Sequence, residues 1–375
     1  MKHSFTEKID IILAKHFNEN AKQIFKNSEL LQYINQKTVS AHKGSKARGS
    51  FGNLYAIYVL VEDYLNEKFD KEGDYSKYEG AKFSNLFKRQ RELAFGSKLQ
   101  NHALNQRMNQ EFNKYFPTCD FVPIIRVVET KRYWINSNLI ELVVNQEKIN
   151  ISHAIIEIIE DYINSKKSAF ESFIQTCKQL KYIGEQETGT IKLFILGLLE
   201  TNVDARIFEI VSYSILKANY LEQSVFFGFT LDSIEEENLK LYKTGRTNAN
   251  DGGIDFVMQP LGRFFQVTET TDVKKYFLDI DKLEKFPITF VVKSTEKAED
   301  LKQKIKDGAE QQYGVEAVVN KYVACIEEII NIQKLKKALD EVEKNGKMND
   351  VLSEIIKQSK VEFNYDEDIV YKIED

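Results

Sequence analysis

Cysteine and proline are scarce in this sequence, and long apolar runs are missing. Its three cysteines are odd in number and far apart in the chain, at Cys119, Cys177 and Cys325, and therefore predict neither a disulfide framework nor a Cys-x-x-Cys metal site. No stretch approaches the roughly 18 consecutive apolar residues of a membrane-spanning helix. The first residues alternate charged with apolar side chains, unlike a signal peptide. We therefore expect a cytoplasmic protein that does not bind a membrane.

Several catalytic signatures are also missing. The five histidines are dispersed and none has metal-ligand spacing. The sequence contains no dinucleotide-binding fingerprint, no kinase signature and no Ser-His-Asp arrangement. The formal net charge of −5 argues against a wholly basic DNA coat protein. It leaves a DNA enzyme open, because the local distribution of charge matters more than the total.

The length of 375 residues predicts two or three domains. The composition becomes polar and glycine-bearing at 184–189, so we place a boundary there, between residues 1–185 and residues 186–375. The first part reads as mainly helical. It also contains four short apolar segments that predict one small antiparallel sheet, at 121–128, 132–135, 139–144 and 148–151.

The most informative stretch lies in the second part. Residues 204–216 have helical apolar spacing, and Glu209 lies inside that helix. Residues 254–258 and 263–268 predict two strands joined by a turn that contains Pro260 and Gly262, which together form a β-hairpin. Asp255 falls inside the first strand, where propensity disfavours aspartate. Coordination of a metal ion is one reason for an acid there.

This order of motifs resembles the PD-(D/E)XK nuclease superfamily, and in particular its Mrr-like restriction endonucleases. The resemblance rests on Phe-Glu in a helix, Gly-Gly-Ile-Asp leading into a strand, and Gln-Val in the next strand, and it covers roughly 206–269. It implies a mixed α/β fold with a central mixed sheet flanked by helices. Further expected elements are strands at 286–293, 318–326 and 361–365 and a helix at 295–312, with a helix as the alternative for 318–326.

The resemblance also implies a Mg²⁺ site and its ligands. Asp255 and Glu209 supply carboxylates, Gln266 a side-chain oxygen and Val267 its backbone carbonyl, which are the oxygen donors that Mg²⁺ prefers. Thr268 stands where the family carries a lysine. Its hydroxyl is too weak a base to activate water, so we expect it to donate or accept a hydrogen bond. The lysine role stays open among Lys274, Lys275 and Lys293.

Two basic stretches predict contacts with DNA. Residues 41–53 predict a glycine-rich loop that carries three positive side chains and no negative one. Residues 81–114 carry seven positive and two negative side chains together with many amides. Lysine and arginine neutralise phosphates, while arginine and amides can also read base edges. The DNA contacts that we predict are Lys43, Lys46, Arg48, Lys88, Arg89, Arg91, Lys98, Gln100, Asn101, Arg107, Asn248 and Asn250.

These observations favour a type II restriction endonuclease that cleaves double-stranded DNA at a short specific site. The 1–185 region would supply most of the recognition. A cognate DNA methyltransferase would act on the same site, and the enzyme could dimerise on a palindrome. Two alternatives stay open, namely a modification-dependent or structure-specific nuclease and a non-catalytic DNA-binding protein with a degenerate nuclease fold.

Overall fold

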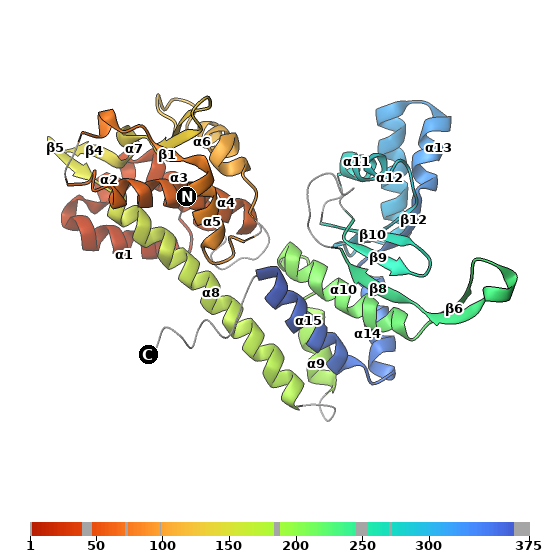
Figure 1. The fold of residues 1–375 in the computed structure, drawn as a ribbon. Coiled ribbons are helices and arrows are strands. Elements are labelled where there is room, and N and C mark those ends of the chain that lie inside the picture. Colours follow the sequence, from red (N-terminus) through yellow and green to blue (C-terminus); the bar gives the residue numbers. More distant parts are fainter. Residues whose placement is uncertain are drawn as a thin grey trace. The chain divides into compact units, whose positions relative to one another are not determined.

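The chain folds into two compact units, which we describe separately. The structure is a computed structural model that describes residues 2–39, 47–71, 74–97, 99–183, 188–244, 254–269 and 272–363, with the backbone alone for 47–49. One unit contains the residues up to Phe173, and the other spans Ile174–Val361 (Figure 1). The fold class is mixed α/β, as predicted.

The first unit is mainly helical, and a long buried helix lies at its centre. Helix α4 (Ala47–Asn66) presents apolar side chains on most of its surface, and Leu54, Tyr55, Ile57 and Val61 are fully buried. The sequence predicted a loop at 41–53. That prediction is wrong for 47–53, which form the start of α4, and 41–46 lie outside the described residues. The other helices of this unit are α1 (Thr6–Phe17), α2 (Ala21–Asn27), α3 (Glu29–Thr38), α5 (Phe83–Glu92), α6 (Met108–Tyr115) and α7 (Ser137–Ile140).

The small antiparallel sheet predicted for this unit is in fact two separate sheets. One has the order β1-β3-β2 and the other is the pair β4-β5. The short helix α7 lies between the two sheets in the chain. Asn136 caps this helix, because its side chain accepts a hydrogen bond from the Asn138 N–H at 3.1 Å. The strands are β1 (Ala81–Lys82), β2 (Ile124–Val127), β3 (Arg132–Ile135), β4 (Glu141–Val144) and β5 (Glu147–Asn150).

One uninterrupted helix, α8 (Ser152–Ile183), follows these strands. Its first half packs in the first unit, where Glu157 forms ion pairs with Lys15 at 2.8 Å and His16 at 2.7 Å. The division between the units falls inside this helix, at Phe173 and Ile174. Among the described residues, no helix is long and apolar enough to cross a membrane.

The second unit is built on a five-stranded mixed sheet with the order β12-β11-β10-β9-β8. Strands β10, β11 and β12 are parallel, whereas β8, β9 and β10 are antiparallel. The predicted hairpin is confirmed as β9 and β10, joined by a turn in which Gly262 has a φ of +66°. The strands are β8 (Lys240–Lys243), β9 (Phe256–Gln259), β10 (Arg263–Thr268), β11 (Ile288–Val292) and β12 (Ile326–Ile330).

Helices cover both faces of this sheet. On one face α10 (Ala205–Leu221) packs Tyr213 against Phe256 in a tilted arrangement and Tyr220 against Phe265 edge to face. On the other face, a core that includes Phe290 is closed by α11 (Val273–Lys282), α12 (Ala298–Tyr313) and α13 (Glu316–Ala324). The remaining helices are α9 (Thr188–Gly197), α14 (Ile332–Lys344) and α15 (Met348–Phe363).

Two predicted strands are wrong. Residues 318–324 belong to helix α13, and the strand β12 begins only at Ile326. Residues 361–363 belong to helix α15, while 364 and 365 lie outside the described residues. In α13 the buried Val319 and Tyr322 are three residues apart, which is helical spacing, and this contact with α11 and α12 overrides the strand propensity of valine.

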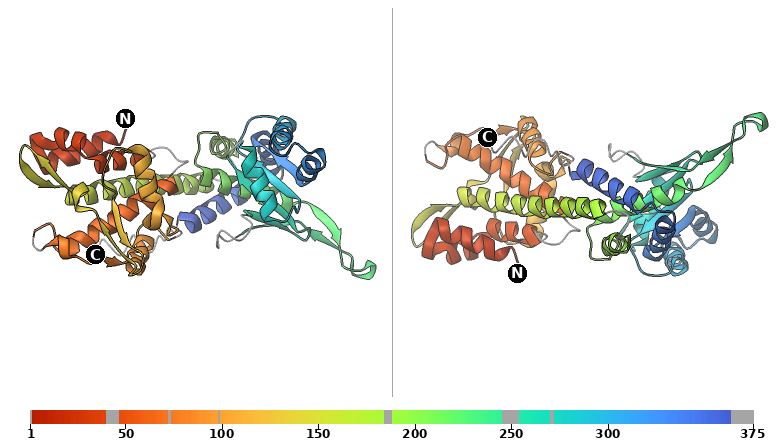
Figure 2. Two further views of the ribbon diagram at one scale, coloured as in Figure 1. Left: turned by 90° about the horizontal axis from the view of Figure 1, so that it is seen from above. Right: turned by 90° about the horizontal axis from the view of Figure 1, so that it is seen from below.

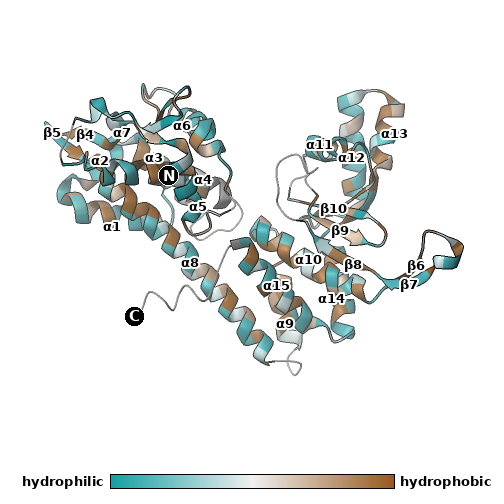
Figure 3. Ribbon diagram, in the orientation of Figure 1, coloured by the Kyte–Doolittle hydropathy of each residue, from teal (hydrophilic) through white to brown (hydrophobic). Residues whose placement is uncertain are grey.

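A two-stranded ribbon extends from the second unit. It consists of β6 (Ser224–Phe227) and β7 (Glu235–Asn238), which pair antiparallel with each other. The ribbon points away from the five-stranded sheet in both views of Figure 2. Colouring by hydropathy separates the apolar β6 from the hydrophilic β7 (Figure 3). The sequence analysis did not predict these two strands, nor β8.

Candidate active site on the five-stranded sheet

Helix α10 carries Glu209 to the sheet. Asp204 caps the helix by accepting a hydrogen bond from the Arg206 N–H at 2.7 Å. Glu209 lies among the buried residues of the helix. Its side chain is only 5% exposed. Two cations neutralise the buried carboxylate: the Arg206 guanidinium contacts Oε2, and the Lys243 Nζ lies 3.1 Å from Oε1.

Backbone hydrogen bonds fix Asp255 directly before the first residue of β9. Its N–H donates to the Phe265 carbonyl at 3.0 Å, and its carbonyl accepts from the Thr244 N–H at 2.9 Å. Its carboxylate Oδ2 accepts from the Val267 N–H at 2.7 Å. The side chain therefore occupies a place in the hydrogen-bonding ladder of β10 just before the first residue of β9, which explains an aspartate at a position that disfavours it.

The surroundings of Asp255 disfavour its charged form. Burial, followed by the nearby negative charge of Glu209, raises the pKa of Asp255 to about 7, against the opposing effects of the Val267 N–H, Arg206 and Lys243. The two carboxylates are thus within electrostatic reach of each other. They come from elements that are 46 residues apart in the chain, and the fold brings them together.

The side chains of Gln266 and Thr268 lie on the other face of the sheet. In the register of β10 and β11, Gln266 is paired with Phe290 and Thr268 with Val292, and both partners belong to the core under α11. Paired residues on neighbouring strands point to the same face. The Thr268 Oγ1 is buried and accepts from the Lys275 Nζ at 3.3 Å. The structure therefore brings Asp255, Glu209 and Val267 together, and separates Gln266 and Thr268 from Glu209.

The three lysines considered from the sequence have different places. Lys275 contacts Thr268, as described, on the α11 face. The side chain of Lys293 is 3% exposed, donates to the Val203 carbonyl and pairs with Glu269 at 2.7 Å. Lys274 lies in the first turn of α11, where its N–H donates to the capping Asp272 at 3.1 Å. None of these contacts joins Lys274, Lys275 or Lys293 to Asp255 or Glu209.

Lys243 is the functional candidate that the sequence analysis missed. It ends β8, where it is paired with Phe256, the residue after Asp255. Its side chain is 14% exposed and reaches Glu209 on the α10 face. The available signal was the alternation in 239–243, where Leu239 and Leu241 are buried and the lysines between and after them are not.

The donors near Asp255 fit a hard divalent cation in kind. Carboxylates and carbonyls are the ligands that Mg²⁺ prefers, and Val267 directs its carbonyl to the same side as its N–H, toward Asp255. The carboxylate count is low: within the described ranges no group of three or more His, Cys, Asp or Glu side chains could hold a metal ion. The raised pKa of Asp255 is the second sign of fit, because a bound cation would stabilise its charged form.

The predicted DNA contacts that the structure describes fall into two groups, those engaged by other residues of the first unit and those that are not. Arg89 forms a two-pronged ion pair with Glu62, at 2.8 and 2.7 Å, and the Arg91 Nε donates to the Ser97 carbonyl at 2.7 Å. Lys88, Gln100 and Arg107 are exposed, and Asn101 is half-buried. Lys43, Lys46, Lys98, Asn248 and Asn250 lie outside the described residues, as does the side chain of Arg48.

Several amides of the same segment have structural roles instead. Gln90 is fully buried and donates to the Gly52 carbonyl at 3.0 Å. The Asn109 side chain holds the backbone of Ile124 at the start of β2, with hydrogen bonds of 2.7 and 3.0 Å. The abundance of amides in 81–114 is therefore partly explained by packing of the first unit.

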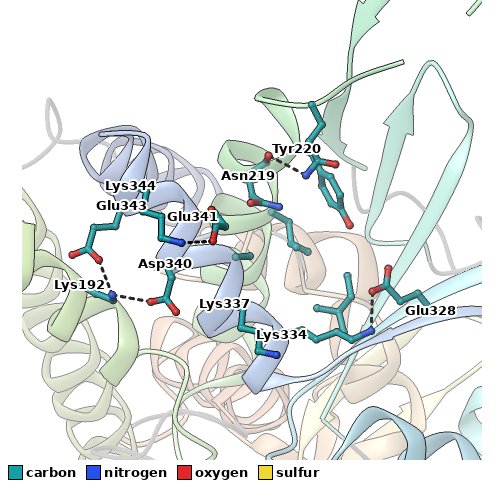
Figure 4. A pocket seen from close by; sticks show the side chains of 14 residues that line it. Lys192, Asn219, Tyr220, Glu328, Lys334, Lys337, Asp340, Glu341, Glu343 and Lys344 are labelled. Carbon is teal, nitrogen blue, oxygen red and sulfur yellow. Dashed lines mark hydrogen bonds and ion pairs between the residues drawn. The ribbon is translucent and has the colours of Figure 1, made fainter. Parts of the chain in front are cut away.

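A cavity of about 730 Å³ opens elsewhere in the second unit, between α9, α10, β12 and α14. Its charged lining is paired internally: Lys192 contacts Asp340 at 2.7 Å and Glu343 at 2.6 Å, and Lys334 contacts Glu328 at 2.9 Å (Figure 4). The described residues that line it include neither Asp255 nor Glu209. We therefore place the candidate site at the carboxylates.

Comparison of the chain with protein-family models, with curated proteins and with solved structures finds no match.

Proposed function

We propose that this protein is a Mg²⁺-dependent endonuclease that cleaves double-stranded DNA at a short specific site, as type II restriction endonucleases do. The observation that carries the proposal is the meeting of Asp255 and Glu209, two acids on different elements, beside the cations Arg206 and Lys243. Buried acids with strongly raised pKa values cluster at functional sites. Helix α10 and strands β9 and β10 follow one another in the order of the helix and two strands on which the sequence resemblance rests.

Each residue of this cluster has a proposed role. Asp255, Glu209 and the Val267 carbonyl would hold Mg²⁺, which when bound supplies an activated water and stabilises the leaving oxygen. The Val267 N–H orients the Asp255 carboxylate. Lys243 and Arg206 balance the charge of Glu209 and can contact a DNA phosphate. Lys243 is our candidate for the role that the family gives to a lysine.

The proposed partners follow from the activity. Double-stranded DNA is the substrate, and a methyltransferase that modifies the same site would protect the DNA of the host cell. The enzyme would work in the cytoplasm. Among the predicted DNA contacts that the structure describes, Lys88 and Arg107 are the basic side chains best placed to contact phosphates, because both are exposed and neither forms an ion pair with a described residue.

Incubation of the protein with unmethylated phage DNA and Mg²⁺ tests the proposal. We expect discrete fragments, and we expect Asp255→Ala to abolish cleavage while it still binds DNA in Ca²⁺. Asp232→Ala, which changes an exposed acid of the same unit, serves as the matched control and should cleave normally.

Three other outcomes would contradict the proposal. Cleavage of modified DNA alone would indicate a modification-dependent nuclease. Binding without cleavage would indicate a DNA-binding protein with a degenerate nuclease fold. Normal cleavage by Asp255→Ala would place the active site elsewhere.

A further inference from the structure

The β6–β7 ribbon is a separate structural feature with no role in the proposed chemistry. Its two strands pair with each other, and in the described sheets neither pairs with another strand. The ribbon extends away from the body of its unit (Figures 1 and 2). An isolated two-stranded ribbon is only marginally stable in water. A third strand would stabilise it.

Large apolar side chains of the ribbon are exposed. Phe226 is 77% exposed, and Phe229 and Leu231 at the tip are 92% and 89% exposed. Leu221, at the base of the ribbon, is 43% exposed. Exposed apolar groups gathered on one projection mark a site of protein association.

The two edges of the ribbon differ in charge. Strand β7 carries three consecutive glutamates, Glu235, Glu236 and Glu237, and charged side chains protect an edge strand from pairing. Strand β6 reads Ser-Val-Phe-Phe and has no charged residue. The β6 edge is therefore open to another strand, whereas the β7 edge repels one that carries the same acids.

Backbone groups on the open edge point outward. The Leu239 N–H donates to the Gln223 carbonyl at 2.9 Å, and the ribbon register pairs Ser224 with Asn238. Hydrogen-bonded and non-hydrogen-bonded pairs alternate along an antiparallel ladder. Val225 and Phe227 therefore bond to β7, while the N–H and carbonyl groups of Ser224 and Phe226 face away from it.

The tip of the ribbon is held in one shape. The Thr230 N–H donates to the Ser233 Oγ at 2.9 Å and begins a capping box. A Cβ atom on Gly228 would lie 2.4 Å from the Ser233 carbonyl oxygen, so this close turn requires glycine. A ribbon that is ordered in advance loses less conformational entropy when it binds.

We infer that the β6 edge is a self-association site, on which a second copy of this chain adds its own β6 antiparallel. The result is a four-stranded sheet with the order β7-β6-β6-β7, in which the acidic strands are outermost and the uncharged strands meet. Phe226 of each copy pairs with Ser224 of the other, and Val225 lies on the two-fold axis. Each tip, with Phe229, then approaches the exposed Leu221 at the base of the other ribbon.

This pairing explains the charge difference between the edges. The same patch serves both copies, as a two-fold interface requires. Pairing through β7 would instead bring six glutamates together. Because the shared edge is short, we expect a weak dimer with a dissociation constant on the order of micromolar.

Sedimentation velocity over a range of micromolar concentrations tests the inference on the full-length chain. Wild type should shift from the mass of a monomer, 43.6 kDa, toward twice that mass. Phe226→Pro removes one outward N–H and keeps the bonds between β6 and β7, so it should raise the dissociation constant about tenfold or more. Phe226→Thr keeps that N–H and removes the ring, so it should weaken the dimer less.

Oxidative cross-linking tests the register. Val225→Cys should form a disulfide between copies, because its two copies face each other in a non-hydrogen-bonded pair. Phe227→Cys, on the same face but off the axis, is the matched control, and wild type accounts for the native cysteines. The double variant Val225→Cys, Phe226→Pro should not cross-link.

Two results would overturn the inference. One is a wild-type chain that stays monomeric throughout the concentration range. The other is a dimer that Phe226→Pro leaves unchanged while Val225→Cys fails to cross-link. Both measurements are independent of DNA cleavage, so they stand whether or not the proposed function is correct.

Discussion

The Lys243 Nζ lies 3.1 Å from the Glu209 Oε1, and the charge of the same lysine also acts on the pKa of Asp255. Lys243, the last residue of β8, thus interacts with both Glu209 and Asp255, two acids that the sequence alone linked only by resemblance. The pair is nearly buried, with 14% of the lysine side chain and 5% of the glutamate side chain exposed. The charge balance of the site therefore depends on Lys243 as well as on Arg206.

Lys243→Met should lower the rate of single-turnover cleavage by about a hundredfold or more, because it removes a positive charge from a site where negative charge develops. Lys243→Arg keeps the charge and should lose less. Lys240→Met, on an exposed position of the same strand, is the control. A Lys243→Met variant that folds and cleaves like wild type would remove this lysine from the mechanism.

Asp255→Asn should stabilise the fold at neutral and higher pH. The pKa of Asp255 is raised to about 7 from an ordinary value of 3.8, so ionising it costs more in the folded chain than in the unfolded chain. Its contribution to stability is therefore present at low pH and is lost as the pH rises through about 7. Asparagine removes that penalty and still accepts from the Val267 N–H.

Denaturant unfolding without divalent cations measures this effect. The free energy of unfolding should rise by roughly 1 to 4 kcal/mol at a pH near 8, and by little at a pH near 4. Asp232→Asn should change neither value, because that acid is exposed. A destabilised Asp255→Asn protein at the higher pH would show that the folded site favours the charged carboxylate.

Thr268→Val and Gln266→Ala should each slow cleavage by about tenfold or less, which corresponds to ~1.4 kcal/mol. Both side chains lie on the α11 face, away from Glu209. The test compares the Mg²⁺ dependence of single-turnover cleavage of these two variants with that of Glu209→Ala. The cleavage rate of Glu209→Ala should fall far more. Damage to Gln266→Ala as severe as that to Asp255→Ala would restore Gln266 as a metal ligand.

Lys88→Ala and Arg107→Ala should each weaken binding to every DNA sequence and reduce the slope of log affinity against log salt by about 1. Both side chains are exposed in the first unit. Arg89→Ala should chiefly lower stability, because Arg89 is engaged by Glu62 at two points. Binding in Ca²⁺ across salt concentrations measures this, with Lys302→Ala as the control. If neither variant changes the slope of log affinity against log salt, Lys88 and Arg107 do not contact DNA phosphates.

Local signals were enough to predict part of the second unit. The turn residues Pro260 and Gly262 predicted the β9–β10 hairpin. The helical spacing of apolar residues after Asp204 predicted α10. Where local patterns were ambiguous, packing decided. The valines of 318–324 favour a strand by propensity, but Val319 and Tyr322 contact a core that requires helical spacing.

The candidate site was predictable only in part, for a related reason. Asp255 could be selected because strand propensity disfavours aspartate, and Glu209 because the order of motifs resembles that of a nuclease superfamily. The role of Lys243 depends on the pairing of β8 with β9, and the face of Gln266 depends on the pairing of β10 with β11. Both are relations between segments distant in the chain, and a pattern within one segment does not contain them.

The buried Lys293 has a consequence for how mutants of this protein are interpreted. Its ammonium joins the Val203 carbonyl, just before α10, to Glu269, just after β10. One side chain therefore sets the spacing between the helix that carries Glu209 and the strand that contains Val267. An alanine scan would score Lys293 beside the proposed metal ligands, although Lys293 would act through the alignment of these two elements. At Lys293, such a scan would then detect a change in the spacing between α10 and β10, and not the loss of a contact with the substrate.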